Sequence, residues 1–315
     1  MSAIRYLAAL LLNPVLPALG QPLVDHHQHL FSPAVVERAG GNTKQVSATD
    51  LAGFLDEAGI ERAVVLSLAY QYANPNRPPV DDEYRKVRAE NEWTSRQVRE
   101  LPGRLQGFCS FDPLADYALQ ELELCAQDPN LNSGLKLHFG DSDVDLEHPD
   151  SLARVQAIFR SANANGMAIL LHIRPSVTRN RPYGATLAQL FLDELLPAAP
   201  DVTVQIAHLA GAGGYDDPAI DEALRVYVDA VARNDPRMTH VYFDVSGVAG
   251  LGDWRDKRDL IATRIRQLGL QRILFGSDGT PDLLRPRDAW AMFRELPLTD
   301  AELDLIMSNV APYLR

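Results

Sequence analysis

The sequence predicts a single α/β domain folded as a (β/α)8 TIM barrel, with a functional site at the carboxyl ends of the strands. Short β-branched or apolar runs alternate with longer amphipathic stretches along nearly the whole chain, which is typical of strand–helix units around a parallel sheet. Ionisable residues recur at the ends of these runs at an almost constant spacing. The 315 residues, 46% of them hydrophobic, are enough to bury one large core.

Eight segments are predicted to be strands because each is a short run of apolar and β-branched residues bounded by turn-forming residues. They are PLVDHH (22–27), RAVVLSLAY (62–70), LQGFCSFDP (105–113), SGLKLHF (133–139), AILLHI (168–173), VTVQIAHLAG (202–211), VYFDVSGV (241–248) and RILFGSD (272–278). Between them, apolar residues recur every three or four positions in predicted helices at 48–59, 81–101, 150–166 and 219–234. An open doubly wound sheet is the alternative fold, but it usually has a glycine-rich phosphate-binding turn after its first strand, where this chain has histidines.

Five predicted strands carry an ionisable residue near their carboxyl ends, although a strand buried on both faces should be almost wholly apolar. Lys136, His172, His208 and Asp244 follow one another at intervals of 36 residues, and Asp278 comes 34 residues later. Because this interval is about one strand–helix unit, we expect these side chains at one rim of the barrel. Active sites of this fold lie at that rim.

The first strand contains three histidines in the stretch DHHQH. Alternate residues of a strand face the same side, so His27 and His29 point together while His26 faces the helical layer. Two imidazoles on one face can bind zinc or a similar divalent ion, and a carboxylate from another strand can complete such a site. His172 and Asp278 are the expected further ligands. The alternative for the pair is a structural role with hydrogen-bonded imidazoles.

Four motifs in the expected order resemble those of a known family: DHHQH in the first strand, LLH in the fifth, IAH in the sixth and FGSD in the eighth. They resemble the amidohydrolase superfamily of metal-dependent hydrolases, in particular the amidohydrolase-related branch that includes aminocarboxymuconate-semialdehyde decarboxylase. Residues 89–114 and 298–315 also resemble segments of that branch, so the likeness spans nearly the whole chain after residue 20.

The resemblance implies that His27, His29, His172 and Asp278 hold one divalent ion, with His208 beside it. Zn²⁺ is expected, and Mn²⁺, Fe²⁺ or Co²⁺ are compatible with the same ligands. Such an ion lowers the pKa of its water and polarises a substrate carbonyl. Asp278 and His208 are the predicted catalytic residues, Asp278 as the base and His208 as the group that polarises the carbonyl or stabilises the oxyanion.

Three further residues are predicted to bind the substrate. Lys136 is expected to stay cationic and to face the substrate, although relatives with two metals carbamylate a lysine here to bridge a second ion held by His172 and His208. His138 shares the inward face and would contact the substrate or metal, or make a hydrogen bond at the rim. Arg174 could pair with a substrate carboxylate through its planar set of donors.

Supporting roles are expected for three residues. Asp244 and Ser246 would orient His208 or Lys136. Asp25 would brace the barrel beneath the metal. Tyr70 and Tyr72 could line the mouth of the pocket, but no role is assigned to them.

These residues predict a hydrolase that acts on a small ester, lactone or amide through a metal-activated water. The alternative is a metal-dependent decarboxylase of an unsaturated or aromatic carboxylic acid. A non-catalytic binding protein for a metal or ligand is disfavoured because Asp278 and His208 are groups that chemistry needs beyond ligation. The net charge of −12 argues against nucleic acid and anionic membrane as partners, so the expected partner is a small-molecule substrate. A homodimer is compatible with the resemblance.

Residues 1–20 are predicted to be a signal peptide because one arginine precedes an apolar stretch that ends in Ala18-Leu19-Gly20. The apolar run is short and is interrupted by Pro14 and Pro17, which argues against a membrane span. The expectation is therefore a periplasmic or secreted domain over residues 21–315. A disordered extension on a cytoplasmic protein is the alternative.

The two cysteines, Cys109 and Cys125, fall in a predicted strand and in the helix that follows it. They could form one disulfide in an oxidising compartment, but the pattern favours buried free thiols. A framework of several disulfides is excluded.

Overall fold

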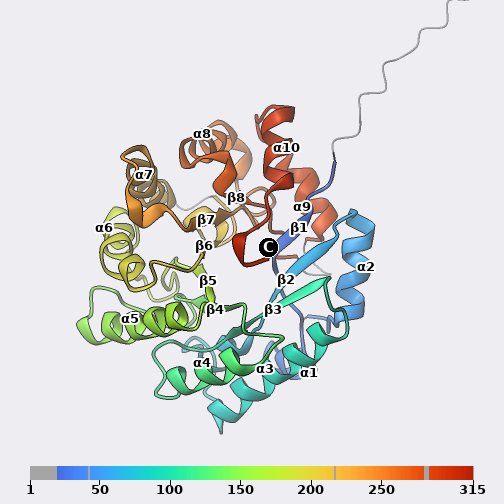
Figure 1. Ribbon diagram of the computed structural model, residues 1–315, viewed down its shortest axis with the longest axis vertical. Coiled ribbons are helices and arrows are strands. Elements are labelled where there is room, and N and C mark those ends of the chain that lie inside the picture. Colours follow the sequence, from blue (N-terminus) through green and yellow to red (C-terminus); the bar gives the residue numbers. More distant parts are fainter. Residues whose placement is uncertain (1–19, 42, 216–217, 280–283, 315) are drawn as a thin grey trace, which may run out of the picture.

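Eight parallel strands follow one another in chain order around a central axis, which confirms the predicted barrel (Figure 1). The computed structural model describes residues 20–41, 43–215, 218–279 and 284–314, so the predicted signal peptide lies almost entirely outside the described residues and stays a prediction. The strands are β1 (Val24–Gln28), β2 (Arg62–Leu66), β3 (Leu105–Ser110), β4 (Gly134–His138), β5 (Ala168–His172), β6 (Val204–Ile206), β7 (Val241–Asp244) and β8 (Ile273–Leu274).

Backbone hydrogen bonds between β1 and the end of β8 close the barrel. The His26 amide donates to the Phe275 carbonyl at 2.9 Å, and the Asp278 amide donates to the His27 carbonyl at 2.8 Å. Gly276 allows this close approach, because a Cβ there would lie 2.7 Å from the Cβ of His27. The closure therefore places the aspartate of the FGSD motif next to the first-strand histidines.

Helices surround the strands on the outside (Figure 1). They are α1 (Pro33–Arg38), α2 (Ala48–Ala58), α3 (Glu83–Arg99), α4 (Ala118–Gln127), α5 (Pro149–Ala164), α6 (Ala185–Leu190), α7 (Pro218–Ala232), α8 (Arg258–Leu268), α9 (Pro286–Phe293) and α10 (Asp300–Ser308). Local sequence sets their ends: Ser47 and Asp50 form a capping box before α2, and Gly59 ends that helix with a φ of 69°.

Alternation along each strand divides the buried apolar residues between two cores. In β5, Ile169 and Leu171 belong to the large core between strands and helices, whereas Leu170 belongs to a smaller core inside the barrel. Full burial of such a side chain contributes roughly 2 kcal/mol. The same alternation turns His172, at the end of β5, and Lys136, in β4, toward the barrel interior.

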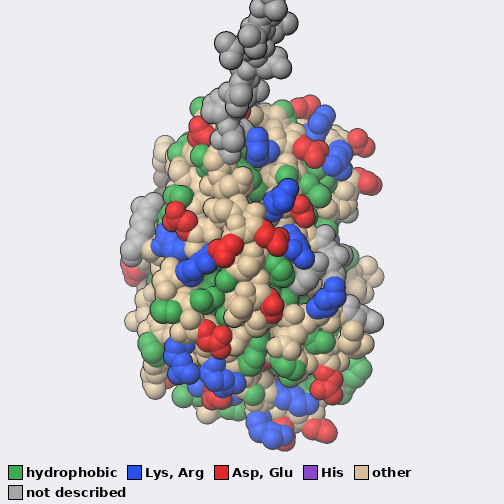
Figure 2. All heavy atoms as spheres, turned by 90° about the vertical axis from the view of Figure 1, so that its right-hand side faces the viewer, with side chains coloured by type: hydrophobic (Ala, Val, Ile, Leu, Met, Phe, Trp, Pro, Cys, Tyr) green, Lys and Arg blue, Asp and Glu red, His purple; other side chains and the backbone are tan. Residues whose placement is uncertain are grey.

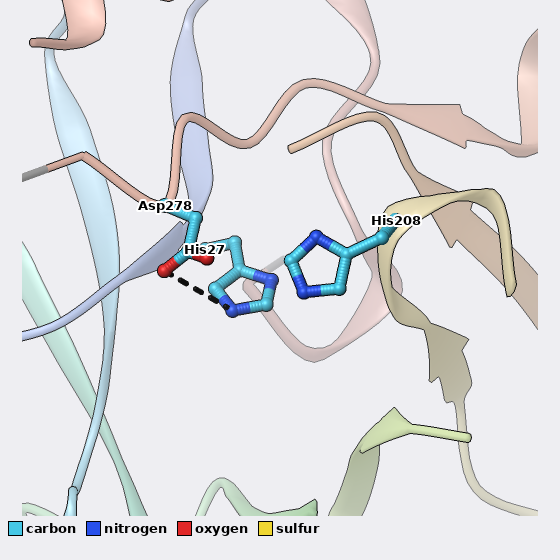
Figure 3. Close-up of side chains that lie close together, drawn as sticks. All are labelled: His27, His208 and Asp278. Atoms are coloured by element: carbon cyan, nitrogen blue, oxygen red, sulfur yellow. Dashed lines mark ion pairs between the residues drawn. The ribbon is translucent and has the colours of Figure 1, made fainter. Parts of the chain in front are cut away.

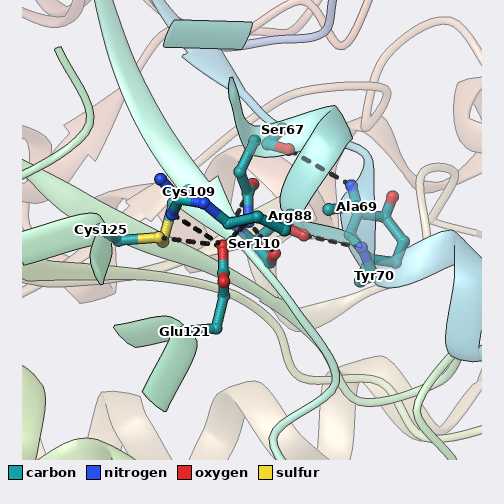
Figure 4. The surroundings of a disulfide bond; sticks show 9 residues. Ser67, Ala69, Tyr70, Arg88, Cys109, Ser110, Glu121 and Cys125 are labelled. Carbon is teal, nitrogen blue, oxygen red and sulfur yellow. Dashed lines mark hydrogen bonds and ion pairs between the residues drawn. A yellow bond between two sulfur atoms is a disulfide. The ribbon is translucent and has the colours of Figure 1, made fainter. Parts of the chain in front are cut away.

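A disulfide joins Cys109 of β3 to Cys125 of α4, with the two Cα atoms 6.2 Å apart (Figure 4). The expectation of free thiols was therefore wrong. Cys109 points outward into the helical layer, and α4 returns along β3 so that Cys125 meets it. Sequence separation gave no measure of this distance, because it depends on how the helix packs.

The face that Figure 2 presents carries acidic and basic side chains mixed together, with apolar side chains between them. In the described part of the chain, no helix has the length and apolar character to cross a membrane.

Candidate metal centre

Three side chains from distant parts of the chain converge at the carboxyl ends of the strands (Figure 3). His27 comes from β1, His208 from the short helix η4 (Ala207–Ala210) after β6, and Asp278 from the segment after β8. One potential ligand atom from each lies within 4.8 Å of the other two. His29 is adjacent, since its Nε2 is 3.5 Å from an Asp278 oxygen.

The tautomers of His27, His29 and His208 are each set by an oxygen that can only accept a hydrogen bond. Nδ1 donates to such an oxygen in three cases: His27 to the Asp244 carboxylate at 3.0 Å, His29 to the Leu66 carbonyl at 2.8 Å, and His208 to the Ser246 carbonyl at 2.8 Å. In the neutral rings Nε2 is then left with its lone pair. This is the arrangement in which a histidine binds a metal through Nε2 and is oriented through Nδ1.

Burial keeps the imidazoles of His29 and His208 uncharged. It lowers the pKa of His29 to about 3 and that of His208 to about 4. Burial alone would raise the pKa of Asp278, but the neighbouring imidazoles and Lys136 together hold it below its ordinary value. The cluster therefore combines neutral nitrogen donors with an ionised carboxylate, which are the forms that bind a divalent ion.

Unusual backbone conformations aim two of these side chains. His208, Leu209 and Ala210 have φ values of 57°, 47° and 64°, and Asp278 has a φ of 49°. These are left-handed conformations that cost free energy in residues other than glycine and are often found at functional sites. Here they turn the chain sharply after β6 and β8, so that the side chains of His208 and Asp278 face His27.

His172, predicted to be a ligand, lies beside the three-residue group and not in it. Its ring centroid is 5.2 Å from that of His208, and its ring stacks on His138 at 3.9 Å. Its Nδ1 is buried and has no hydrogen-bond partner among the described residues. His29 likewise lies outside the tightest group, whereas His208, expected only beside the metal, belongs to it.

The site opens into a cavity of about 220 Å³. Its walls contain the histidines of the site together with Phe31, Leu68, Tyr70, Gln71, Lys136, Ala212 and Asp278. Lys136 is 1% exposed, and its Nζ lies 3.3 Å from the Nε2 of His27. Burial lowers the pKa of Lys136 to about 8, although Asp278 and Asp244 favour the charged form.

Arg174 lines an adjoining cavity of about 270 Å³ and not the metal cavity itself. The two cavities share His138, His172 and Ala212 as lining residues. The Arg174 guanidinium carbon lies 4.7 Å from the centre of the Tyr183 ring. A ligand that filled both cavities would pass along the His138 ring.

Sequence reasoning assigned no role to Tyr70, which lines the metal cavity and stacks on His138 with ring centroids 5.0 Å apart. Its amide donates to the Ser110 hydroxyl at 2.9 Å, beside the disulfide (Figure 4). Tyr70 lies in the short helix η1 (Ala69–Ala73), four residues after β2 ends, and a tyrosine in the loop at the carboxyl end of a barrel strand could have signalled this position. Figure 4 also shows Glu121, whose carboxylate accepts from Asn91 at 2.8 Å and holds this region together.

Asp244 has a wider role than the sequence predicted. One oxygen accepts from the His208 amide at 3.0 Å, as a residue orienting His208 should, but the other bonds to His27. Asp25 accepts hydrogen bonds from the Ser277 amide at 2.9 Å and from the Ser277 hydroxyl at 2.6 Å. It therefore fixes the segment that carries Asp278.

The donors present fit a divalent metal ion. Several imidazole rings and one carboxylate line a common cavity. The Nδ1 atoms of His27, His29 and His208 are already hydrogen-bonded to the protein, which leaves their Nε2 atoms for a metal. His27, His208 and Asp278 would hold such an ion, and His29 and His172 are close enough to take part. Zinc, manganese, iron and cobalt all accept these ligands.

A closed barrel with this cluster at the carboxyl ends of its strands defines a class of barrel enzymes. Within that class, the family model described as amidohydrolase matches residues 24–311, so the chain belongs to the amidohydrolase family. A comparison with curated proteins gives no match.

Solved structures with the same fold include decarboxylases and hydrolases. 5-Carboxyvanillate decarboxylase from Sphingomonas paucimobilis is 18% identical, with a TM-score of 0.62 over 91% of this chain and 97% of that one. 2,6-Dihydroxybenzoate decarboxylase from Rhizobium is 17% identical, with a TM-score of 0.61 over 91% and 96%. A probable 2-pyrone-4,6-dicarboxylic acid hydrolase from Acinetobacter baumannii is 19% identical, with a TM-score of 0.60 over 90% and 96%. At these identities the likeness establishes the fold alone.

Proposed function

We propose that the protein is a metal-dependent decarboxylase that acts on a small unsaturated or aromatic carboxylic acid. Hydrolysis was the first expectation from the sequence, with decarboxylation as the alternative. The observation that favours the alternative is the buried ammonium of Lys136, 3.3 Å from the Nε2 of His27. Several of the similar solved structures, including those from Sphingomonas paucimobilis and Rhizobium, are of decarboxylases.

The charge balance of the cavity supports an anionic substrate. Its lining histidines have lowered pKa values where a shift is resolved, so Asp278 supplies the negative charge and Lys136 the positive charge. A divalent ion would make the cavity strongly positive. Such a cavity stabilises a carboxylate, whereas a neutral ester or lactone gains little from a buried ammonium.

The residues have separate roles in this proposal. Lys136 binds the substrate carboxylate and holds it against the cluster. The bond between the carboxylate carbon and its neighbour breaks, carbon dioxide leaves, and the electron pair remains on the substrate carbon. A bound divalent ion would supply electrostatic stabilisation of that negative charge.

Asp278 is the group placed to deliver the proton that replaces carbon dioxide. Its side chain is 33% exposed, so it can take a proton from water and pass it to the substrate carbon. The stacked rings of Tyr70 and His138 line the same cavity as Asp278. A flat aromatic surface of this kind suits a planar unsaturated acid.

Hydrolysis of a small lactone or ester is the second candidate. It is supported by the juxtaposition of Asp278 and His208, which could activate a water and stabilise an oxyanion. The similar structure from Acinetobacter baumannii, a probable hydrolase, has the same fold.

A two-panel assay tests the proposal. Metal-loaded protein is incubated with hydroxybenzoates and unsaturated carboxylic acids, and in parallel with lactones and esters, while carbon dioxide and acid release are measured separately. We expect carbon dioxide from at least one acid and none with the Asp278→Asn variant. Acid release from lactones without carbon dioxide from any acid would replace decarboxylation by hydrolysis. Tight binding of an acid without turnover would favour the binding-protein alternative.

A further inference from the structure

The last described residues enter the barrel from the amino ends of the strands. After α10, the short helix η8 (Pro312–Leu314) lies near the centre of the barrel in Figure 1. The Ala311 amide donates to His26 at 3.2 Å, and the Leu314 carbonyl accepts from Arg62, at the start of β2, at 3.3 Å. These bonds fix the segment in place.

The Tyr313 ring packs into the small core inside the barrel. It meets Phe108 edge-on, with ring centroids 5.0 Å apart and planes at 63°. Gly134 leaves the space for Phe108, because a Cβ at that position would lie 2.4 Å from its ring. The phenol hydroxyl reaches Gln205, the middle residue of β6.

A continuous chain of hydrogen bonds leads from Tyr313 to the metal cluster. The Tyr313 hydroxyl donates to Gln205 Oε1 at 2.5 Å, and Gln205 Nε2 donates to Asp244 Oδ2 at 2.8 Å. The same Asp244 oxygen accepts from His27 Nδ1 at 3.0 Å. Gln205 and Asp244 are both fully buried.

The direction of this chain follows from the chemistry of its members. An ionised carboxylate only accepts hydrogen bonds, so Gln205 must present its amino group to Asp244 and its carbonyl to Tyr313. Tyr313 must then donate. Burial raises the pKa of Tyr313 well above its ordinary value, which keeps that proton in place.

The two oxygens of Asp244 have different partners. Oδ1 accepts from the His208 amide at 3.0 Å and from the Ser246 hydroxyl at 2.5 Å. Oδ2 accepts from His27 and Gln205. The position of the oxygen that orients His27 therefore depends on Gln205. Tyr313 donates to the carbonyl of the Gln205 amide, and the His26 carbonyl accepts from its amino group at 3.3 Å.

We propose that Tyr313 is a positioning residue for the metal ligand His27, acting through Gln205 and Asp244. The inference rests on the proposed metal centre. Loss of the phenol hydroxyl would leave the buried carbonyl of Gln205 without its donor, so the Gln205 side chain would shift and its hydrogen bond to the Asp244 oxygen would weaken. The His27 imidazole would then be less well oriented for metal binding, although three hydrogen bonds lie between it and Tyr313.

Zinc affinity provides the test. Metal-free wild-type protein and the Tyr313→Phe variant, each with any affinity tag at the N-terminal end, are titrated with Zn²⁺ in competition with a chromophoric chelator. Phenylalanine keeps the ring contact with Phe108 and removes only the hydroxyl. We expect zinc binding to weaken by about tenfold, the lower end of the effect of removing an outer partner of a metal ligand.

Three further variants separate positioning from general loosening. Tyr227→Phe removes another buried phenol hydroxyl, one without a hydrogen-bond partner among the described residues, and should change zinc affinity by less than about twofold. Gln205→Met should weaken binding at least as much as Tyr313→Phe. The double variant Tyr313→Phe/Gln205→Met should bind no more weakly than Gln205→Met, because the two residues act in one chain.

The outcomes distinguish the inference from the function on which it rests. Wild-type affinity in Tyr313→Phe, or equal weakening in Tyr227→Phe, would overturn the role of Tyr313. Additive losses in the double variant would also contradict it. If wild-type protein and His27→Ala bound zinc equally, the proposed metal centre itself would be wrong.

Discussion

Asp244 Oδ2 lies 3.0 Å from His27 Nδ1, although 217 residues separate the two in the chain. Burial alone would raise the pKa of Asp244, but His27, His208 and the Ser246 hydroxyl hold it well below its ordinary value. The carboxylate is therefore charged and fixes the tautomer of His27. This pair links the fold to the proposed metal centre.

Asp244→Asn should weaken zinc binding by about 10- to 100-fold, because an amide nitrogen in place of Oδ2 cannot accept from His27. The dissociation constant from chelator competition measures the effect. Glu121→Gln is the matched comparison: it alters another buried carboxylate, one that accepts from Asn91 beside the disulfide, and should change zinc affinity by less than about twofold. Equal affinity in Asp244→Asn and wild-type protein would refute the orienting role.

Lys136→Met should lower kcat/KM by roughly 100-fold or more while the protein keeps about one equivalent of zinc, because it removes a substrate-binding cation and no metal ligand. Steady-state kinetics and elemental analysis check the two parts. Two equivalents in wild-type protein and one in the variant would instead identify Lys136 as a carbamylated bridge between two ions.

Reduction of the Cys109–Cys125 disulfide should lower the free energy of unfolding by about 3 kcal/mol, the value expected for a closed loop of this size. The 16-residue separation of the two cysteines sets that loop. Urea denaturation with and without a reductant measures the change, and the Cys109→Ala/Cys125→Ala variant should not respond to the reductant. Two reactive thiols in unfolded, unreduced protein would show that the disulfide does not form.

Glu90 should make stability depend on pH. Its carboxylate is 3% exposed, and burial raises its pKa to about 7, although the Ser32 hydroxyl donates to it at 2.5 Å. A pKa raised on folding contributes stability below the unfolded value of about 4.5, and this contribution is lost as the pH rises through about 7.

Glu90→Gln imitates the neutral acid, so it should match wild-type protein near pH 4.5 and exceed its stability by about 2 kcal/mol at pH 8. Urea denaturation at the two pH values measures the difference. Glu92→Gln, on the exposed side of the same helix, should change stability by less than about 0.5 kcal/mol at both pH values. A pH-independent effect of Glu90→Gln would contradict the raised pKa.

The barrel, and the ionisable residues that lie at its functional rim, were predictable because both follow from local repetition in the sequence. The interval of 36 residues between Lys136, His172, His208 and Asp244 is about one strand–helix unit, so these residues were expected at one edge of the barrel. Alternation within a strand also separated His27 and His29 from His26. The Nδ1 of His26 bonds to the Phe275 carbonyl at 2.9 Å, on the other side of the strand from the cluster. These properties require only the periods of strands and helices.

The atoms that meet at the site were decided by the tertiary structure. The left-handed turn at His208 places that residue in the tightest group, whereas His172, with a regular strand end, lies beside it. Such turns depend on contacts with neighbouring strands, and no local pattern in the sequence encodes them.

The sequence by itself determined the barrel, its family and the residue types at its rim, since periodicity and motif order are local properties. Only the tertiary structure decided that Cys125 reaches Cys109, that Tyr70 stacks on His138 and that Tyr313 reaches Gln205. Each of these contacts joins separate elements. Its distance is set by how helices and the C-terminal segment pack on the barrel, and packing is a property of the whole chain.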